Sequence, residues 1–534
     1  MKYAICQINT SVGDLKYNYK KIIGNYQLSL SKGADLVIFP ELTITGYPPK
    51  DLLLDKAFID RNLYYSKKIS KQSTKPIIFG FVDRERNQIY NSLAICYNGE
   101  LFGSYNKKLL PNYDIFDEKR YFKSGKKSGV FKINYNDLNL TVGLQICEDL
   151  WDDNYKVKIS EQQKKNGAEI IINCSASPFT TNKLNKRVDL IKKKATTLNL
   201  PIIYCNQVGA QDEIIFDGNS LIFSKYGDLI SQGKSFSECN IITEMDSQSN
   251  IKLNIQSKEE KIFNALCLGI SDYFGKTGNK EAVLGLSGGI DSSLTAAIAV
   301  NAIGSKNVHG ILMPSKFSSK HSTEDAIALA KNLEMHYEII PIQKSVDSMI
   351  SSLSKSFNGK KVDRTEENIQ SRIRGNILMS FANKFNWLLL TTGNKTELAL
   401  GYCTIYGDMN GSLGVISDLN KLDVYKVAKW YNKSFEKKIP LNSILKPPSA
   451  ELSKNQIDPY DYEIISPIVD LIIEDKFTLE EIKRINTNYD NIDSLYYKIR
   501  NNEFKRYQSA PTLKINDKSF GVGRRYPIVN NFGG

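Results

Sequence analysis

The stretch AVLGLSGGIDSSLTAAIAV (residues 282–300) decides the fold, because a buried strand runs through a glycine-rich loop straight into a helix. Gly288 and Gly289 carry no side chains, so backbone N–H groups of the loop can approach a bound anion. The helix that follows adds the positive end of its dipole. The loop also contains three hydroxyl donors: Ser287, Ser292 and Ser293. This pattern predicts a phosphate-binding loop.

Asp291 distinguishes this loop from a Walker A loop, which ends in Gly-Lys followed by Ser or Thr. A carboxylate inside a phosphate cradle would repel the phosphate unless a cation lay between them. We therefore predict that Asp291 is a magnesium ligand. The alternative is a helix cap on a glycine-rich turn, since Ser and Asp both cap helices well. The complete strand–loop–helix context favours the phosphate site.

The alternation of strand and helix continues on both sides of the loop, which predicts a doubly wound parallel sheet. Strands are expected at 281–287, 308–314 and 337–342, and helices at 258–274, 291–303 and 322–334. The C-terminal part is mainly helical, and its last stretch is irregular.

From residue 1 to about 245, short apolar strands again alternate with amphipathic helices, which predicts another layered α/β unit. Strands are expected at 3–9, 34–41, 75–83, 91–98, 140–147, 168–176, 200–209 and 219–225, and helices at 16–31, 156–166 and 184–198. The polar stretch 244–261 contains few apolar residues. We therefore expect domains at 1–245 and 261–534, joined by a linker at 246–260.

Length and composition agree with this division, because 534 residues are too many for one hydrophobic core. The chain is 41% hydrophobic and 24% charged, and no apolar run approaches the ~18 residues needed to span a bilayer. Its eight cysteines form no C-x-x-C pair, which fits a reducing cytoplasm. The net charge of +13 could indicate nucleic-acid binding. Because lysines occur along the whole chain, we expect neither a nucleic-acid nor a membrane partner.

The glycine-rich loop resembles that of the N-type ATP pyrophosphatases, which cleave ATP to AMP and pyrophosphate while they activate a carbonyl oxygen. Residues 367–411 and 502–515 closely resemble the synthetase domain of the glutamine-dependent NAD synthetases. This resemblance implies that ATP and deamido-NAD are substrates, and that Asp291 and Glu397 share a magnesium ion. It assigns ATP to Ser287, Gly288, Gly289, Asp291, Ser292, Ser293 and Thr392, and deamido-NAD to Asn368, Glu397, Asp408 and Lys505.

Residues 313–326 belong to the same resemblance, which implies a mobile loop near the phosphates. Its expected members are Lys316, Ser318, Ser319 and Lys320. The alternative is an ordinary polar loop that caps a helix starting near Ser322. Arg374 and Lys505 are expected to offset substrate charge together with magnesium.

The first half of the chain resembles the nitrilase/amidase superfamily in residues 35–53, 105–122 and 143–151. The resemblance implies an α-β-β-α sandwich and a catalytic triad of Glu41, Lys107 and Cys147 that hydrolyses an amide. Lys108 remains an alternative to Lys107, because strand alternation cannot separate the two. The superfamily's glutamine-holding positions correspond to Tyr113, Ser177 and Lys183, with Glu118 supporting the lysine. Cys174 matches no superfamily motif and is expected to pack in the core.

Cys147 is followed at once by Glu148 and Asp149, and adjacent negative charge would raise the pKa of a thiol. If the strand continues through Cys147, side-chain alternation directs Glu148 to the opposite face from the thiol. The groups that decide its ionisation would then be Glu41 and Lys107.

Together the two resemblances imply a ligase of NAD biosynthesis that hydrolyses glutamine in one domain and uses the ammonia to amidate ATP-activated deamido-NAD in the other. Members of that family assemble through their synthetase domains, which implies a homo-oligomer of at least two chains. Two alternatives stay open. One is another adenylating glutamine amidotransferase, and the other is a nucleic-acid-binding protein with a degenerate amidase fold.

Overall fold

The structure is a computed structural model that describes residues 1–136, 138–245, 250–436, 438–485, 489 and 491–530. It forms two compact units, Met1–Gln256 and Ser257–Gly534, each with its own sheets and core. Residues 246–249 of the expected linker lie outside the described residues, so the linker at 246–260 stays a prediction. Within the described ranges, the chain has no helix with the length and apolar character needed to cross a membrane.

The first unit contains two six-stranded sheets. One sheet has the order β14-β1-β2-β3-β4-β5, formed by Cys239–Glu244, Lys2–Gln7, Leu36–Ile38, Ile77–Glu85, Gln88–Tyr97 and Glu100–Asn106. The other has the order β13-β12-β9-β8-β7-β6, formed by Leu229–Gln232, Leu221–Phe223, Ile202–Asn206, Ile170–Ser175, Leu138–Ile146 and Val130–Tyr135. A separate hairpin pairs β10 (Val208–Gln211) with β11 (Ile214–Asp217).

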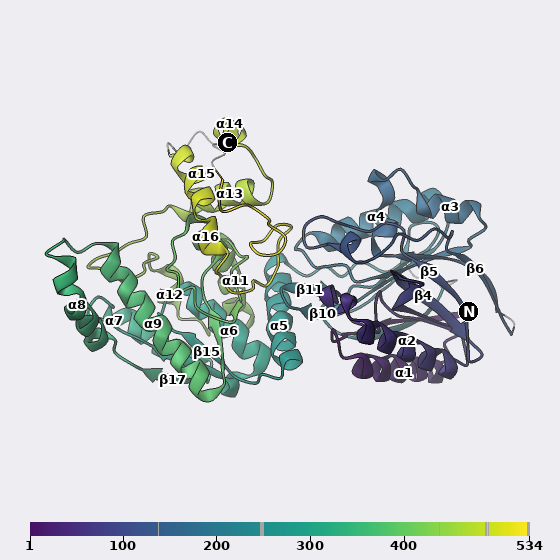
Figure 1. Cartoon of the computed structure of the whole chain (residues 1–534), viewed down its shortest axis with the longest axis horizontal. Coiled ribbons are helices and arrows are strands. Elements are labelled where there is room, and N and C mark those ends of the chain that lie inside the picture. Colours follow the sequence, from purple (N-terminus) through teal and green to yellow (C-terminus); the bar gives the residue numbers. More distant parts are fainter. Residues whose placement is uncertain (137, 246–249, 437, 486–488, 490, 531–534) are drawn as a thin grey trace. The chain divides into compact units, whose positions relative to one another are not determined.

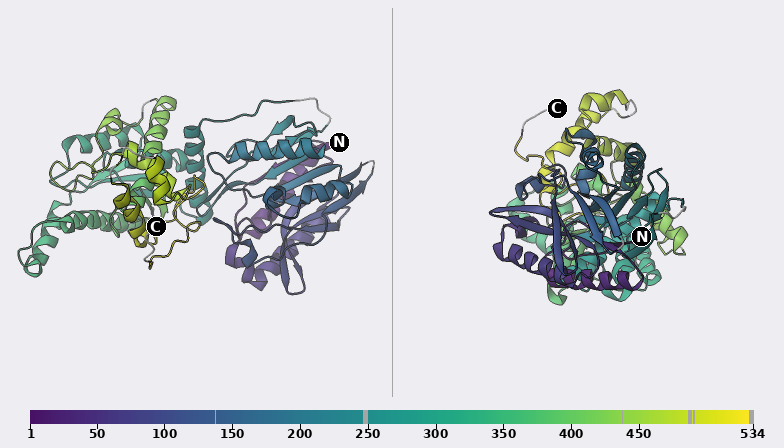
Figure 2. Two further views of the ribbon diagram at one scale, coloured as in Figure 1. Left: turned by 90° about the horizontal axis from the view of Figure 1, so that it is seen from above. Right: turned by 90° about the vertical axis from the view of Figure 1, so that its right-hand side faces the viewer.

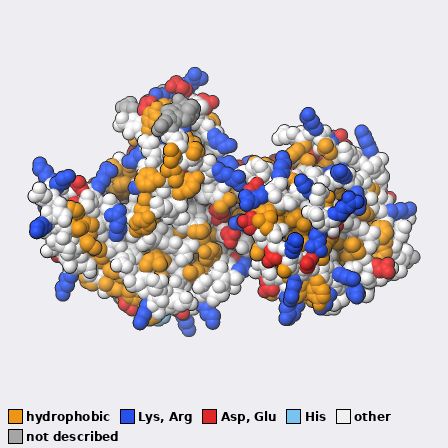
Figure 3. Space-filling model, viewed as in Figure 1, with side chains coloured by type: hydrophobic (Ala, Val, Ile, Leu, Met, Phe, Trp, Pro, Cys, Tyr) orange, Lys and Arg blue, Asp and Glu red, His pale blue; other side chains and the backbone are white. Residues whose placement is uncertain are grey.

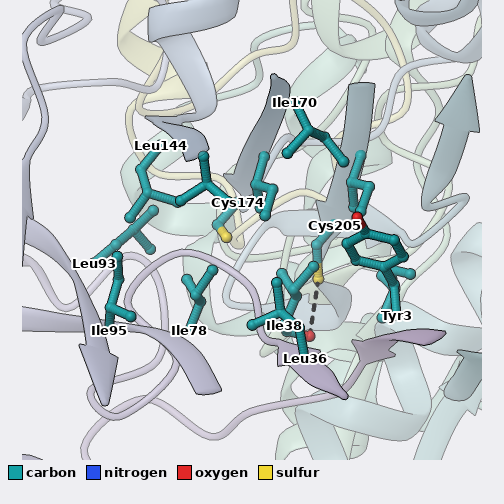
Figure 4. Packing of buried hydrophobic residues seen from close by; sticks show 14 of the residues in the cluster. Tyr3, Leu36, Ile38, Ile78, Leu93, Ile95, Leu144, Ile170, Cys174 and Cys205 are labelled. Atoms are coloured by element: carbon teal, nitrogen blue, oxygen red, sulfur yellow. Dashed lines mark hydrogen bonds between the residues drawn. The ribbon is translucent and has the colours of Figure 1, made fainter. Parts of the chain in front are cut away.

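The inner faces of the two sheets pack on one another (Figure 4). Strand β1 has apolar residues on both faces, because one face packs against the other sheet and the opposite face packs against helices. Its Tyr3 and Ile5 join the core between the sheets, whereas Ala4 and Cys6 join the core under the helices. Cys174 is fully buried in the core between the sheets, which confirms its expected packing role.

Helices cover the outer face of each sheet and complete the expected α-β-β-α sandwich (Figures 1 and 2). α1 (Leu15–Ser31) and α2 (Lys56–Gln72) cover the first sheet. α3 (Ile159–Lys165) and α4 (Lys183–Leu198) lie on the side of the second, whose core includes residues of α4. α2 begins after Asp55, whose side chain accepts from the Ala57 N–H at 2.8 Å, and it buries residues at helical spacing, among them Ile59 and Ile69.

All eight strands expected in the first half have a counterpart, but the one expected at 200–209 is divided into β9 and β10, and β5, β6, β11, β13 and β14 were not predicted. β5 begins with three exposed residues, and no residue of β14 is fully buried. β5, β6, β13 and β14 are the edge strands of the two large sheets and carry only short apolar runs, so their sequences lack the signal by which central strands are recognised. β11 is the exception, because it contains the buried apolar run 214–216.

The second unit contains a parallel five-stranded sheet of order β17-β16-β15-β18-β19. The strands are His336–Ile339, Val308–Leu312, Ala282–Gly285, Leu388–Thr391 and Leu413–Gly414. The chain proceeds from β15 in one direction to β17 and then returns to β18 on the other side of β15. Ligands of such sheets bind where this order reverses, beyond the carboxyl ends of the strands. Here that point lies between β15 and β18.

Helices surround this sheet and extend to the C-terminal part. They are α5 (Lys258–Thr277), α6 (Ile290–Ile303), α7 (Lys320–Asn332), α8 (Gln343–Phe357), α9 (Arg364–Phe385), α10 (Lys395–Leu400), α11 (Lys421–Ser434), α12 (Leu441–Leu445), α13 (Tyr462–Ile473), α14 (Leu479–Ile485), α15 (Ile492–Asn501) and α16 (Glu503–Arg506). The expected doubly wound sheet is confirmed. Helix α7 begins at Lys320, two residues before the expected start at Ser322, because the Ser319 side chain caps it.

Candidate active sites

The predicted triad of the first unit comes from three strand ends. Glu41 follows β2, Lys107 follows β5 and Cys147 follows β7, and all three side chains are buried. Gly80 in β3 lets the segment of Glu41 lie directly on the sheet. A Cβ atom at Gly80 would overlap the Leu42 nitrogen and lie 2.6 Å from the Glu41 carbonyl carbon.

Lys107 connects two buried carboxylates. Its Nζ donates to Glu41 Oε1 at 2.7 Å and to Glu118 Oε1 at 2.8 Å. Glu41 is held further by Asn91 Nδ2 at 2.7 Å and by the Ala176 N–H at 2.9 Å. Burial alone would lower the pKa of Lys107, but the charges of Glu118, Glu41 and Cys147 outweigh it and hold that pKa well above its ordinary value. Lys107 is therefore a fixed positive charge.

Lys108 lies differently. Its backbone N–H donates to Asp149 Oδ1 at 3.1 Å, and its carbonyl accepts from Ser124 Oγ at 2.7 Å. Of the two candidate lysines, Lys107 is the one whose ammonium group contacts Glu41.

Cys147 differs from the expectation that the strand runs through it. β7 ends at Ile146, and Cys147 has a φ of 41° at the start of a 3-10 turn, Cys147–Leu150. Burial is the main cause that raises the pKa of the Cys147 thiol, and the charge of Glu41 raises it further. The charge of Lys107 acts in the opposite direction but does not offset them, so the pKa lies well above its ordinary value. Glu148 also raises this pKa, so the neighbour in the sequence does act on the thiol. The resting thiol is protonated, and attack on a substrate needs a base that removes the proton.

The three predicted glutamine-holding residues lie on different segments. Tyr113 Oη donates to Glu148 Oε2 at 3.0 Å, and Ser177 Oγ accepts from Arg187 Nη2 at 3.4 Å. Lys183 starts α4, and its ammonium group lies 4.2 Å from the centre of the Trp151 ring.

Glu148 and Arg187 were not predicted as site residues. Glu148 also accepts from Tyr155 Oη at 2.8 Å, and the fully buried Arg187 pairs with Asp217 at 3.1 Å. The sequence signal for Glu148 is its place directly after Cys147. Strand alternation through Cys147 predicts that Glu148 points away from the thiol, so this signal was not used. Nothing local marks Arg187 as different from the other basic residues of its helix.

The glycine-rich loop of the second unit connects β15 to α6 at the point where the strand order reverses. Gly288 has a φ of 74°, and a Cβ atom there would overlap the Ser322 carbonyl oxygen. Ser292 Oγ and Ser293 Oγ donate to the Gly289 carbonyl at 3.1 and 2.8 Å. Ser287 Oγ lies 3.1 Å from Ser292 Oγ. The predicted hydroxyl donors thus also hold the loop in shape.

The loop opens onto a cavity of about 430 Å³, within the range of small-molecule sites. Of the predicted substrate residues, those that line it are Ser287, Gly289, Asp291, Ser292, Asn368, Thr392, Glu397, Asp408 and Lys505. Gly288 and Ser293 are not among the lining residues.

Asp291 and Glu397 approach one another through Lys421, which was not predicted. Lys421 Nζ donates to Asp291 Oδ2 at 2.6 Å and to Glu397 Oε1 at 3.2 Å. Asn394 Nδ2 donates to Asp291 Oδ1 at 2.9 Å, and the Asn394 N–H donates to Glu397 Oε2 at 3.2 Å. Burial raises the pKa of Glu397 to about 7.

Magnesium is usually held by one or two carboxylates together with substrate phosphates. Asp291 and Glu397 supply such a pair of carboxylates at the phosphate loop, so their donor chemistry fits the ion. Among the residues described, no group of three or more His, Cys, Asp or Glu residues could hold a metal.

The predicted deamido-NAD residues line the same cavity. Asn368 Oδ1 accepts from Thr404 Oγ1 at 2.8 Å, and Asp408 Oδ1 accepts from the Thr404 N–H at 2.6 Å. Lys505 Nζ donates to the carbonyls of Gly401 at 2.7 Å and Cys403 at 2.8 Å. Thr392 follows β18 directly.

Arg374 on α9 also lines the cavity, and its Nε donates to the Met313 carbonyl at 3.1 Å. Burial lowers the pKa of this guanidinium to about 10.

The segment between β16 and α7 has features of both interpretations of residues 313–326, the loop near the phosphates and the polar loop that caps a helix. Ser318 lines the cavity and Ser319 caps α7. Glu451 contacts this segment, because its carboxylate accepts from Ser319 Oγ at 3.0 Å and from Ser322 Oγ at 2.6 Å. The mobility of the segment stays a prediction, as do the roles expected for Lys316 and Lys320.

Comparison with known proteins places each unit in a family. Residues 2–253 match the carbon-nitrogen hydrolase family, and residues 262–509 match the NAD synthase family. The glutamine-dependent NAD(+) synthetase of Thermotoga maritima is 40% identical over 100% of this chain and 99% of its own length. The enzyme of the same name from a Synechocystis species is 40% identical over 99% of this chain and 98% of its own.

The chain belongs to the glutamine-dependent NAD(+) synthetase family.

Solved structures of glutamine-dependent NAD(+) synthetases agree. The protein from Acinetobacter baumannii, in complex with adenosine diphosphate, is 35% identical, has a TM-score of 0.80 and covers 99% of this chain and 98% of its own. The protein from Cytophaga hutchinsonii has a TM-score of 0.86 over 99% of this chain and 98% of its own. At 21% identity that second likeness supports the fold alone.

Proposed function

We propose that this glutamine-dependent NAD(+) synthetase hydrolyses glutamine in its first unit and uses the ammonia to convert deamido-NAD to NAD in its second, with cleavage of ATP. The observation that carries the proposal is the full-length match to enzymes of this name, in a chain that retains both sites. One site has a buried carboxylate, lysine and cysteine, and the other has a phosphate loop beside two carboxylates.

In the first unit, Glu41 takes the proton of Cys147 as the sulfur attacks the glutamine amide carbon. Lys107, permanently charged, stabilises the oxyanion of the tetrahedral intermediate. Glu41 then returns the proton to the departing nitrogen, which leaves as ammonia. A thioester remains on Cys147. Water, activated by Glu41, hydrolyses the thioester to glutamate. Tyr113, Ser177 and Lys183 hold the rest of the glutamine molecule.

In the second unit, the loop Ser287–Ser293 binds the ATP phosphates through backbone N–H groups and the dipole of α6. The nicotinate carboxylate of deamido-NAD attacks the α-phosphorus, so that pyrophosphate leaves and an acyl-adenylate forms. Ammonia then displaces AMP to give the amide of NAD. Asn368, Asp408 and Lys505 hold deamido-NAD beside the phosphates, and Thr392 contacts ATP.

Asp291 and Glu397 would hold Mg²⁺, which supplies positive charge to the phosphates when it is bound. Lys421 and Arg374 are among the chain's own cations that line the same cavity, together with Arg364, Lys446 and Lys505. Lys421 keeps the two carboxylates close to one another, because it pairs with both.

The test measures NAD, AMP and pyrophosphate from ATP, Mg²⁺ and deamido-NAD, with either glutamine or an ammonium salt. We expect Cys147→Ala to abolish synthesis from glutamine and to retain synthesis from ammonium. We expect Asp291→Ala to abolish synthesis from both sources while glutamine hydrolysis persists. No NAD from either nitrogen source with the unmodified protein would refute the proposal, and loss of both activities in Cys147→Ala would refute the division of labour.

Two further parts of the proposal concern the whole molecule. We expect at least a dimer, as the resemblance to the NAD synthetases implies. Large apolar side chains are exposed in the second unit, among them Met349, Val362 and Phe385. Hydrophobic side chains are also visible at the surface of this unit in Figure 3. A monomer mass from light scattering at micromolar concentration would contradict this expectation. A cytoplasmic location suits the eight free thiols.

A further inference from the structure

Asp149, two residues after the nucleophile, is fully buried and takes no part in the chemistry described above. Its two carboxylate oxygens accept four hydrogen bonds. Oδ1 accepts from the N–H groups of Lys108 at 3.1 Å and Leu109 at 2.9 Å. Oδ2 accepts from the Ile146 N–H at 3.0 Å and from Tyr105 Oη at 2.8 Å.

These four donors lie beside the two catalytic residues that belong to different sheets. Tyr105 and the Lys108–Leu109 pair flank Lys107, at the end of β5 in the first sheet. Ile146 directly precedes Cys147, at the end of β7 in the second sheet. One side chain therefore joins the backbone around the lysine to the backbone around the cysteine.

The connection is needed at this place because the chain turns sharply at Cys147. The sheet hydrogen bonds end at Ile146, and Cys147 itself has a left-handed conformation that L-residues seldom adopt. A strained turn keeps its shape only when its surroundings hold it. The bond from the Ile146 N–H to Asp149 closes the turn, and the bonds to Lys108 and Leu109 fix it against the lysine segment.

We propose that Asp149 is a positioning residue of the glutaminase site, which sets the place of Cys147 relative to Lys107 by holding the backbone on either side of both. This inference rests on the proposed glutamine hydrolysis. It predicts that Asp149 affects the rate at which Cys147 attacks glutamine and not the affinity for glutamine. Among the contacts described, Asp149 has no hydrogen bond to Tyr113, Ser177 or Lys183.

Asp149→Asn is the informative variant, because it keeps the size of the side chain and half of its acceptors. The amide oxygen can still accept from Lys108 and Leu109, and the Tyr105 hydroxyl can turn to accept from the new NH₂ group. The Ile146 N–H cannot turn, so it would face a donor and lose its partner. The substitution thus releases the residue next to the nucleophile.

The chain offers a matched control at Asp152, three residues further on. Asp152 is also buried, and its carboxylate accepts from the Ile159 N–H at 2.7 Å and pairs with Lys194 at 2.5 Å. Among the contacts described, the Asp152 carboxylate has no hydrogen bond to the segment around Lys107. Asp152→Asn therefore removes a buried carboxylate of the same turn region without releasing Ile146.

The experiment compares wild type, Asp149→Asn, Asp152→Asn and Tyr105→Phe in the full chain. We expect Asp149→Asn to lower kcat for glutamine hydrolysis by about 100-fold, the cost of an ångström-scale displacement of a reacting group. KM for glutamine and synthesis from ammonium should not change, and alkylation of Cys147 by iodoacetamide, followed by mass spectrometry of its peptide, should slow. Tyr105→Phe, which leaves the three backbone donors in place, should retain most of kcat.

Three outcomes would overturn the inference: unchanged kcat in Asp149→Asn, an equal loss of kcat in Asp152→Asn, or a rise in KM with kcat preserved. If wild type itself hydrolyses no glutamine, the proposed function fails instead. The two failures are therefore distinguishable.

Discussion

Lys107→Met tests the electrostatics of the glutaminase site, because it removes a buried cation and keeps an unbranched side chain of similar length. Glu41 and Glu118 are both buried and would lose the ammonium group that lies 2.7 and 2.8 Å from them. Removing one partner of a buried ion pair typically costs about 3–5 kcal/mol. We expect the free energy of unfolding of the first unit to fall by this amount at pH 8.

The loss should shrink at lower pH. Burial already raises the pKa of Glu118 to about 7 beside Lys107, and without the lysine it rises further. A carboxyl whose pKa is raised in the folded state binds more protons there than in the unfolded chain. It therefore favours folding at pH below the unfolded pKa of ~4.3, and that contribution is lost as pH rises through the folded value. The difference from wild type should be smaller at pH 5.5 than at pH 8.

Urea unfolding followed by tryptophan fluorescence measures the effect, because Trp151 is the one tryptophan of the first unit. Trp387→Phe and Trp430→Phe, introduced together in every variant, remove the signal of the second unit, whose separate unfolding would otherwise obscure the transition. Adding Glu118→Gln to Lys107→Met should restore part of the stability. A loss below about 1 kcal/mol at both pH values would refute the reasoning, since that is the scale of an exposed pair.

Other predictions concern the second unit. Gly288→Ala should abolish ATP-dependent synthesis and lower the melting temperature, because the new Cβ would overlap the Ser322 carbonyl oxygen. Gly278 is the control, because it has a similar φ of 78° but no atom lies within 4 Å of its Cβ position. Gly278→Ala should therefore cost only about 1 kcal/mol. Equal effects of the two substitutions in thermal unfolding would contradict the packing argument. Lys395→Met should destabilise the unit by about 3–5 kcal/mol, measured in urea, because this fully buried lysine pairs with three carboxylates. Burial raises the pKa of Glu474 to about 7 despite that lysine, so this carboxyl should cost the unit stability as pH rises from the unfolded value of ~4.3 through 7. Glu474→Gln should therefore reduce the fall in melting temperature between pH 5 and 8, and the share from Glu397, whose pKa is also raised to about 7, should remain.

The parts of the fold that sequence reasoning predicted are those with local signals. The loop Ser287–Ser293 is marked by glycines between a strand and a helix, and the central strands by continuous apolar runs. β14 has neither signal, and its place is set by pairing with β1, more than two hundred residues earlier. Pairing over such a distance depends on the tertiary fold, which overrides local propensity.

In the candidate sites, too, the residues that the sequence predicted are those with a local signal. Glu41, Lys107 and Cys147 lie within recognisable motifs, and their roles stay predictions that the variants above test. Lys421 lies 130 residues from Asp291 in the sequence, and nothing around it distinguishes it from the chain's many other lysines. Strand alternation through Cys147 predicts that Glu148 points away from the thiol, but the strand ends at Ile146. A change of one residue's φ at the strand end, which depends on the surrounding turn, reversed that conclusion.

The pairing of β1 with β14 has a consequence during synthesis on the ribosome. Residues 2–7 leave the ribosome long before their partner strand, which ends at residue 244. At ~5–20 residues per second, the first strand waits on the order of 10–50 s for that partner. Throughout this interval one edge of a strand with apolar residues on both faces is unpaired, the condition under which strands join neighbouring chains. Nascent chains translated together on one messenger are therefore exposed to aggregation through this edge until residue 244 emerges.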